Sequence, residues 1–369
     1  MMEIGGEFHL PLLQIFNRRL NQFDRFTPNS SQYFLTSSGR DSLRCIIKIL
    51  ALSADDEVLL PAYLPEYILN PFAEEHVKFV LYKINKDLSV DIDDIEKRIT
   101  CKTKALLFIH YFGYPQPITE LQKLCREYSL SLIEDAVQSF LTRYEGRFLG
   151  CFGDLSFTSF RKFVPVLDGS LLLVNNSNRS NNLRNCKYRN LSLDYLYYVG
   201  LRYLAMNLKN LYLKTGLVPK PLFLWLFSSA DGMLNKSTKP SSISHLSQCL
   251  LKRFDFDDII LKRRRNFQYL LDNWNSNLLQ CFFTELPDHV CPLGFPVLAK
   301  NRDYVKHELI KRRIYPPVHW NLPSEINEEE FKASWEISRT ILTIPIDQRY
   351  DIHDMDHILV QLREIEAGN

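Results

Sequence analysis

The first half of the chain alternates between short apolar runs and segments whose apolar residues recur every three or four positions. The runs predict buried strands, and the helical spacing predicts helices between them. This order predicts an α/β fold with a mostly parallel mixed sheet covered by helices. Strands are expected at 58–61, 77–82, 105–110, 130–134, 155–160 and 170–174, and helices at 42–52, 65–75, 92–99 and 119–128.

The second half of the chain has a weaker pattern. Residues 176–263 are mainly helical in their spacing, and shorter helical and strand segments follow. We therefore predict a large α/β domain over 1–245, with a variable helical region at 176–245, and a smaller α+β C-terminal domain over 246–369. In the smaller domain, helices are expected at 264–274, 302–312 and 355–366, and strands near 296–298 and at 342–344.

Composition narrows the classes of function. The chain has 369 residues, of which 46% are hydrophobic, so it is long enough to bury a large core. Its formal net charge of +2 gives no electrostatic reason to expect nucleic acid as a partner. The first residues do not resemble a signal or transit peptide, and we expect a cytoplasmic protein.

One apolar stretch, 195–227, is rich in Leu, Tyr and Phe. Arg202, Lys209, Lys214 and Pro219 interrupt it before it reaches the roughly 20 apolar residues that a membrane-spanning helix needs. We predict no transmembrane segment and interpret the stretch as a core helix. Contact with a partner or with a membrane surface stays open as the alternative.

Small and hydroxyl residues surround Gly39 at the start of the first predicted helix, in the segment 36–42. Backbone N–H groups at such a helix start are free to bind phosphate. Any capped helix looks similar, so this segment alone does not identify a phosphate site.

Two further segments carry reactive side chains at strand ends. Asp135 follows the strand at 130–134, where ligands of open α/β sheets bind, and an Asp there can pair with a protonated pyridine nitrogen. Lys162 follows the strand at 155–160, and desolvation would lower the pKa of its amine enough for imine formation. The alternatives are an Asp that caps the next helix and a solvated lysine. His110, at the end of another strand, is interpreted as a core histidine, with a ligand-binding group as the alternative.

The order of these segments resembles the DegT family of sugar aminotransferases, which have the aspartate aminotransferase fold (fold type I). The likeness is good over 31–176 and looser from 263 to the end. It rests on the phosphate motif, Leu60 to Tyr63, His110 to Gly113, Ile133 to Gln138, the approach through Gly146, Gly150, Gly153 and Asp154, the pair Asp168 and Gly169, Pro316 to His319, and Leu342 to Pro345.

The resemblance implies pyridoxal 5′-phosphate as the cofactor and Lys162 as the catalytic residue that carries it as a Schiff base. It implies no metal site. The other cofactor-binding roles are also carried over from the family. Gly39, Arg40 and Asp41 would hold the phosphate, mainly through backbone amides, Asp135 would pair with the ring nitrogen, Gln138 would lie near the ring hydroxyl, Ser159 would add a hydroxyl, and Tyr63, preferred over Tyr67, would stack on the ring.

The sequence departs from the family pattern at several positions. Phe157 stands where the family has a serine five residues before the lysine, and Pro65 stands where an aromatic residue is expected. Ser170 replaces the second glycine after the acid. The family's Asn-x-Arg segment, which reaches into the partner subunit's site, is not recognisable at 235–242. These changes bear on the choice of substrate more than on cofactor binding.

The function that the resemblance implies is amino transfer from an amino acid, with glutamate as the expected donor, to a keto group of a nucleotide-linked sugar. Such a reaction belongs to polysaccharide or glycan precursor biosynthesis, and a homodimer is expected because the family builds its sites at a dimer interface. Two alternatives stay open. One is a sugar dehydratase of the same fold, whose members replace the lysine with histidine, and the other is a non-catalytic binding or regulatory homologue.

Overall fold

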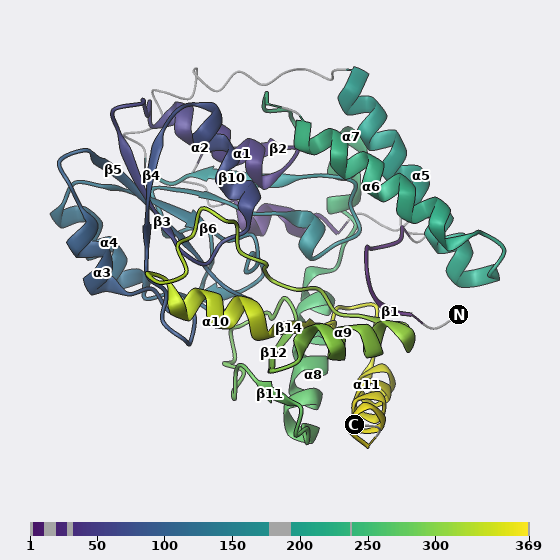
Figure 1. The fold of residues 1–369 in the computed structure, drawn as a ribbon. Coiled ribbons are helices and arrows are strands. Elements are labelled where there is room, and N and C mark those ends of the chain that lie inside the picture. Colours follow the sequence, from purple (N-terminus) through teal and green to yellow (C-terminus); the bar gives the residue numbers. More distant parts are fainter. Residues whose placement is uncertain (1–2, 11–19, 28–31, 177–192, 237, 368–369) are drawn as a thin grey trace.

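The structure is a computed structural model that describes residues 3–10, 20–27, 32–176, 193–236 and 238–367. Its centre is a seven-stranded sheet with the order β2-β10-β9-β6-β5-β3-β4 (Figure 1). β10 is antiparallel to both of its neighbours, β2 and β9, and all other neighbouring strands of this sheet are parallel, so the predicted mostly parallel mixed sheet is confirmed. The strands are β2 Gln32–Thr36, β3 Glu57–Pro61, β4 Lys78–Tyr82, β5 Thr103–Ile109, β6 Ser131–Asp135, β9 Leu155–Phe157 and β10 Ser170–Val174.

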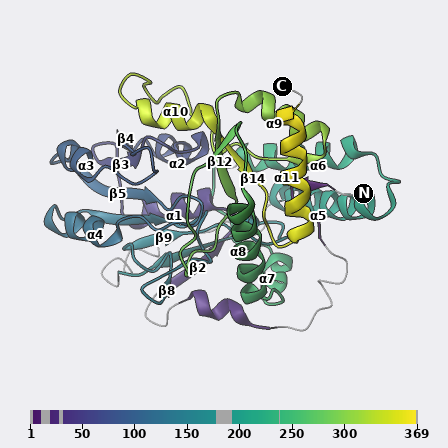
Figure 2. The ribbon, with the colours of Figure 1, turned by 90° about the horizontal axis from the view of Figure 1, so that it is seen from below.

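Helices flank this sheet, and short apolar strands form its buried centre (Figures 1 and 2). All five residues of β6 are buried, as expected for a strand covered on both faces. The helix α1 begins three residues before the prediction, because Ser38 caps it by accepting a hydrogen bond from the Asp41 N–H. The helices are α1 Gly39–Ile49, α2 Asn70–Glu74, α3 Ile92–Arg98 and α4 Ile118–Glu127, with 3-10 turns at Gln22–Phe26, Glu66–Ile68 and Phe160–Lys162.

The strand predicted at 155–160 is shorter in the structure. It ends at Phe157, and the chain turns through the 3-10 helix Phe160–Lys162 before it returns as β10. Gly169 closes this turn, where a positive φ of 127° and a side chain of Ile243 within 2.5 Å of any added Cβ both require glycine. A small two-stranded ribbon, β7 Arg143–Tyr144 with β8 Arg147–Phe148, lies between β6 and β9 in the chain.

The apolar stretch 195–227 forms parts of two helices and not one core helix. Helices α5 Leu193–Thr215 and α6 Lys220–Lys236 pack side by side (Figure 1). One face of the pair is buried. Of the nineteen exposed large apolar side chains among the described residues, nine lie elsewhere on these two helices, Trp225 among them, and a tenth, Leu217, lies in the turn between them. The prediction of a core helix is therefore only half right. None of the helices in the described part of the chain has both the length and the apolar content that crossing a bilayer requires.

The C-terminal part has its own antiparallel sheet of order β11-β12-β14. The N-terminal strand β1 Ile4–Gly5 joins this part, because it pairs in parallel with β13 Ile314–Tyr315. The division of the chain at residue 245 stays a prediction. The elements are α7 His245–Leu251, α8 Phe256–Asn273, β11 Leu279–Cys281, β12 Phe295–Ala299, α9 Arg302–Lys311, α10 Lys332–Thr340, β14 Ile341–Ile344 and α11 Ile352–Ala367.

Candidate active site

A cavity of about 390 Å³ lies at the carboxyl edge of the central sheet. Parallel strands end together at this edge: Ile109 of β5 is in register with Asp135 of β6, which is in register with Phe157 of β9. The segment after β2 and the turn before β10 reach the same edge, since Thr36 pairs with Ser170. Ligands of open α/β sheets bind at this position.

The start of α1 forms one end of the cavity, through Ser37, Ser38, Gly39 and Arg40. The first N–H groups of a helix have no acceptor within it, so those of Gly39 and Arg40 are free for an anion. The Arg40 guanidinium lies 5.9 Å from the centre of the Tyr67 ring and makes no ion pair with a described carboxylate. This end therefore has the chemistry of a phosphate site.

Asp41, the third predicted phosphate residue, does not line the cavity. Its carboxylate accepts hydrogen bonds from Arg44 at 2.8 Å, from Ser37 at 2.5 Å and from the Ser241 N–H at 3.1 Å. Burial raises its pKa. The Asp41 side chain thus connects the start of α1 to the segment before α7. The backbone N–H of Asp41 already donates a hydrogen bond to the Ser38 hydroxyl that caps the helix.

Asp135 and Gln138 also line the cavity. The Oδ1 atom of Asp135 accepts from the Val137 N–H at 2.8 Å, and burial raises the pKa of this carboxyl to about 7. Gln138 accepts from the Phe112 N–H at 2.7 Å through Oε1, whereas its buried Nε2 has no acceptor. Buried polar groups are normally paired, so an unused donor beside a cavity indicates a ligand.

Lys162 and Ser159 reach the same cavity from the turn after β9. The Lys162 amine makes no hydrogen bond to a described residue, and burial together with the neighbouring charge of Arg161 lowers its pKa. An amine of lowered pKa is neutral more often near pH 7, which is the form that attacks a carbonyl. The structure thus brings Gly39, Arg40, Asp135, Gln138, Ser159 and Lys162 to one cavity.

The two tyrosines differ in their positions. Tyr67 lines the cavity, whereas Tyr63 is fully buried and donates a hydrogen bond from its hydroxyl to the His319 carbonyl. The Tyr63 ring packs against Trp320, with 5.6 Å between ring centres, and Trp320 itself lines the cavity. Tyr67 and not Tyr63 thus lines the cavity, and which ring stacks on the cofactor stays a prediction.

The remaining motif residues have structural contacts. His110 is a buried core histidine, hydrogen-bonded to Glu134 at 3.1 Å and to the Gln116 N–H at 3.0 Å. Glu134 also accepts from the N–H groups of Gly150 at 2.6 Å and Gly153 at 2.9 Å. The hydrogen bonds from Gly150 and Gly153 to Glu134 therefore stabilise the loop that leads to β9.

Sequence reasoning missed several cavity residues. Glu7 comes from the N-terminal segment, Arg161 precedes Lys162, Asp231 lies on α6, and Trp320 follows β13. No local pattern marks Glu7 or Asp231, because each reaches the cavity through contacts between distant segments. Trp320 directly follows a segment that was recognised, Pro316 to His319, and that proximity was the available signal.

Comparison with known proteins agrees with this geometry. The family model described as "DegT/DnrJ/EryC1/StrS aminotransferase family" matches residues 16–209. GDP-perosamine synthase of Escherichia coli O157:H7 is 28% identical over 189 residues, which is 49% of this chain and 51% of that protein. A dTDP-4-dehydro-2,3,6-trideoxy-D-glucose 4-aminotransferase of Saccharopolyspora spinosa is 30% identical over 43% of this chain and 42% of that protein. The chain thus spans about half the length, or less, of these relatives.

Solved structures resemble the whole chain. Helicobacter pylori PseC, an aminotransferase involved in the biosynthesis of pseudoaminic acid, has a TM-score of 0.72 at 17% identity over 98% of this chain and 99% of that one. DesV of S. venezuelae has a TM-score of 0.69 at 20% identity over 98% and 90%. At such identities the likeness shows the fold, and it confirms the predicted fold type I. The family match covers more than half of the chain, and the chain therefore belongs to the DegT/DnrJ/EryC1/StrS aminotransferase family.

Proposed function

We propose that this chain is a pyridoxal-phosphate-dependent aminotransferase. It moves an amino group from an amino acid, with glutamate as the proposed donor, to a keto group of a nucleotide-linked sugar in polysaccharide or glycan precursor biosynthesis. One observation carries the proposal: a single cavity holds the unpaired amine of Lys162, the buried carboxyl of Asp135 and the free start of α1.

The residues of the cavity fit the cofactor. Its volume of about 390 Å³ is within the roughly 300–1,000 Å³ of small-molecule and cofactor sites. The N–H groups of Gly39 and Arg40, with the Arg40 guanidinium, suit the phosphate, and the unused Nε2 of Gln138 suits the ring hydroxyl. Tyr67 and Trp320 supply aromatic surface beside these groups.

When bound, pyridoxal phosphate supplies an aldehyde that reacts with amines and a ring that takes up the electron pair left at the donor carbon. Lys162 would hold the cofactor and then carry the proton that leaves this carbon. Asp135 would keep the ring nitrogen protonated, since a carboxylate whose pKa is raised by burial is stabilised by a cation beside it. Phe157 and Val137 add apolar surface to the lining of the cavity.

The acceptor class rests on the relatives. The two curated relatives are named for GDP-linked and dTDP-linked sugars, and PseC is an aminotransferase involved in the biosynthesis of pseudoaminic acid. We extend that acceptor class to this chain. A homodimer and a cytoplasmic location belong to the same proposal, and light scattering and cell fractionation test them.

The proposal is tested by adding pyridoxal phosphate to the purified protein. We expect a visible absorbance band that L-glutamate bleaches and that the variant Lys162→Ala lacks. Lys104→Ala, an exposed lysine at the far end of β5, is the matched control and should keep the band. A wild-type protein without the band, or with a band that glutamate leaves unchanged, would contradict the proposed function.

A panel of keto sugars linked to different nucleotides then tests the acceptor. Transfer of nitrogen from labelled glutamate to at least one of them is expected. Bleaching by glutamate without transfer to any nucleotide-linked keto sugar would keep the amino transfer and refute the acceptor class.

A further inference from the structure

Two carboxylates and two guanidiniums form a cluster beside the cavity, which we call its mouth because the side chains of the two acids, Glu7 and Asp231, are each 41% exposed to water. Arg202, on α5, donates to Glu7 at 2.8 Å and to Asp231 at 3.0 Å. Arg161 donates to Asp231 at 3.2 Å and to the Tyr198 hydroxyl at 3.3 Å, and its Nη2 atom is 4.0 Å from Glu7. Glu7, Arg161 and Asp231 line the cavity, and Arg202 does not.

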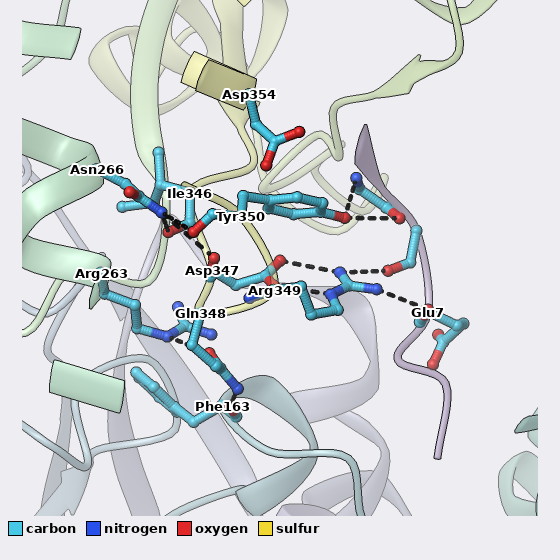
Figure 3. A network of polar contacts seen from close by, with 12 residues as sticks. Glu7, Phe163, Arg263, Asn266, Ile346, Asp347, Gln348, Arg349, Tyr350 and Asp354 are labelled. Atoms are coloured by element: carbon cyan, nitrogen blue, oxygen red, sulfur yellow. Dashed lines mark hydrogen bonds and ion pairs between the residues drawn. The ribbon is translucent and has the colours of Figure 1, made fainter. Parts of the chain in front are cut away.

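Hydrogen bonds from Arg349 and Lys209 hold the N-terminal segment in place at Glu7. Arg349 donates to the carbonyl oxygens of Gly6 and Glu7, each at 3.1 Å, while it pairs with Asp347 (Figure 3). On the other side, the Lys209 amine donates to the Glu7 carbonyl at 2.5 Å. The backbone at Glu7 is thus fixed between the C-terminal part and α5.

The two guanidiniums are not equivalent. The side chain of Arg202 is 2% exposed and makes the shorter contacts with both acids, whereas that of Arg161 is 23% exposed and makes the longer ones. If Arg161 released Asp231, both carboxylates would keep Arg202 as a partner, and both are 41% exposed to water. The cost of an unpaired buried charge does not arise, so Arg161 can exchange its partner.

An amino-acid donor needs such a cation close to the reacting amine. Its α-carboxylate is bonded to the carbon that carries the amino group, and arginine binds carboxylates with two parallel hydrogen bonds. Arg161 is adjacent to Lys162 in the chain, and both line this cavity. The other lining guanidinium, Arg40, lies at the phosphate end.

We infer that Arg161 binds the α-carboxylate of the amino donor, with Asp231 as the carboxylate that occupies it until the donor arrives. Asp231 and Glu7 then stay with Arg202, and the mouth of the cavity keeps its shape during the exchange. The inference rests on the proposed function, because it assigns the donor site of the same reaction. It makes Arg161 a specificity-determining residue for α-amino acids.

The variant Arg161→Met tests the inference, because it keeps the length of the side chain and removes its charge. The probe is glutarate, a dicarboxylate without an amine, and its binding to the cofactor-loaded protein is measured by calorimetry. A hydrogen-bonded charged pair contributes about 1.5–3 kcal/mol, which is about a 10- to 150-fold change in affinity. Glutarate should bind the variant that much more weakly, and Arg161→Lys should restore part of the loss.

The half-reaction gives a second readout. L-Glutamate is compared with 4-aminobutyrate, which is glutamate without its α-carboxylate. We expect Arg161→Met to lower the ratio of kcat/KM for glutamate to kcat/KM for 4-aminobutyrate about 10- to 150-fold, because the effect of the lost charge on the Lys162 amine is common to both donors and cancels in the ratio. The same change at Arg98, on α3 and outside the cavity, is the control and should alter neither value.

Glutarate that binds Arg161→Met as it binds the wild type, or a wild type that does not bind glutarate, would overturn the inference. An unchanged preference for glutamate over 4-aminobutyrate would do the same. Failure of the proposed function would give a different result. The wild type would then lack the visible band, whereas glutarate binding would still depend on Arg161. Melting temperatures of all variants separate these effects from unfolding.

Discussion

The two ends of the cavity satisfy their charges in opposite ways. At the sheet edge, Asp135, Gln138 and Lys162 keep atoms that no described residue uses, so this end is complete only with a ligand. At the mouth, Glu7 and Asp231 are already paired with Arg202. A buried group without a partner costs free energy, so the inner end is held for function, whereas the mouth stabilises itself and can exchange one partner.

The two acids nearest these ends titrate in opposite directions. Burial raises the pKa of Asp135 to about 7. Burial also acts to raise the pKa of Glu7, but Arg202 and Arg161 outweigh it and lower this pKa to about 2. The same cavity thus holds one acid that is easily protonated and one that is almost always charged near neutral pH.

The largest expected effect on stability lies just behind the inner end. Glu134→Gln replaces an oxygen that accepts from backbone N–H groups by an amide nitrogen that cannot accept. We expect it to lower the free energy of unfolding by about 3–5 kcal/mol, because it breaks a buried charged network. Denaturant unfolding measures this loss. Glu127→Gln, exposed on α4, should change the value by less than about 0.5 kcal/mol.

A Glu134→Gln protein as stable as the wild type would mean that this carboxylate does not support the loop before β9. The distinction between Glu134 as a structural acid and Asp135 as a functional acid would then fail.

Asp135 should shift stability with pH in the cofactor-free protein. Its folded pKa, about 7, lies above the ordinary value of 3.8, so the folded state binds the proton more tightly between these values. The contribution of Asp135 to the free energy of unfolding is therefore greatest at low pH. It falls by at most about 4 kcal/mol as pH rises from about 4 to about 7. Asp135→Asn should remove this slope and leave the protein at least as stable as the wild type at pH 8.

Glu7 should act with the opposite sign. Its folded pKa is below the ordinary value of 4.5, so its contribution is present above about 4.5 and is lost as pH falls toward about 2. Glu7→Gln should flatten the acid limb of the stability curve while Asp135→Asn flattens the limb between 4 and 7. If the two variants changed the same limb, the contrast between the two ends would be wrong.

The smallest expected effect separates the two tyrosines. Tyr67→Leu should weaken the binding of pyridoxal phosphate by about 0.5–1.5 kcal/mol, because it removes an aromatic face from the cavity. Tyr63→Phe should leave cofactor affinity unchanged and cost about 0.5–1.5 kcal/mol of stability, since it removes a buried hydrogen bond. Fluorescence titration and denaturant unfolding measure the two quantities. An unchanged cofactor affinity in Tyr67→Leu, with a loss in Tyr63→Phe, would restore the assignment made from the sequence.

Local patterns were enough to predict the sheet and its inner site. Strands such as β5 and β6 are almost wholly apolar, and the residues that follow them meet at one edge because parallel strands end together. The edge strand β2 was missed, since its mixed exposure gives no clear period. The shortening of β9 depends on the turn at Gly169, which a strand pattern does not contain.

The mouth of the cavity could not be predicted in this way. Glu7 reaches it through β1 and Arg349, and Asp231 reaches it through the packing of α6 on α5. These contacts join segments that are hundreds of residues apart or whose register the sequence does not reveal. The position of Tyr63 away from the cavity could not be predicted for a related reason, because the fold of the loop after β3 decides which ring lines the cavity.

The central claim is that Lys162 binds the cofactor, and one measurement addresses it directly. The protein is loaded with pyridoxal phosphate, reduced with borohydride, digested and mapped by mass spectrometry. We expect the mass of the reduced cofactor on the peptide that contains Lys162. Lys209 is the sharpest competitor, because burial lowers the pKa of its amine to about 8. A label on Lys209, or on no lysine at all, would contradict the account.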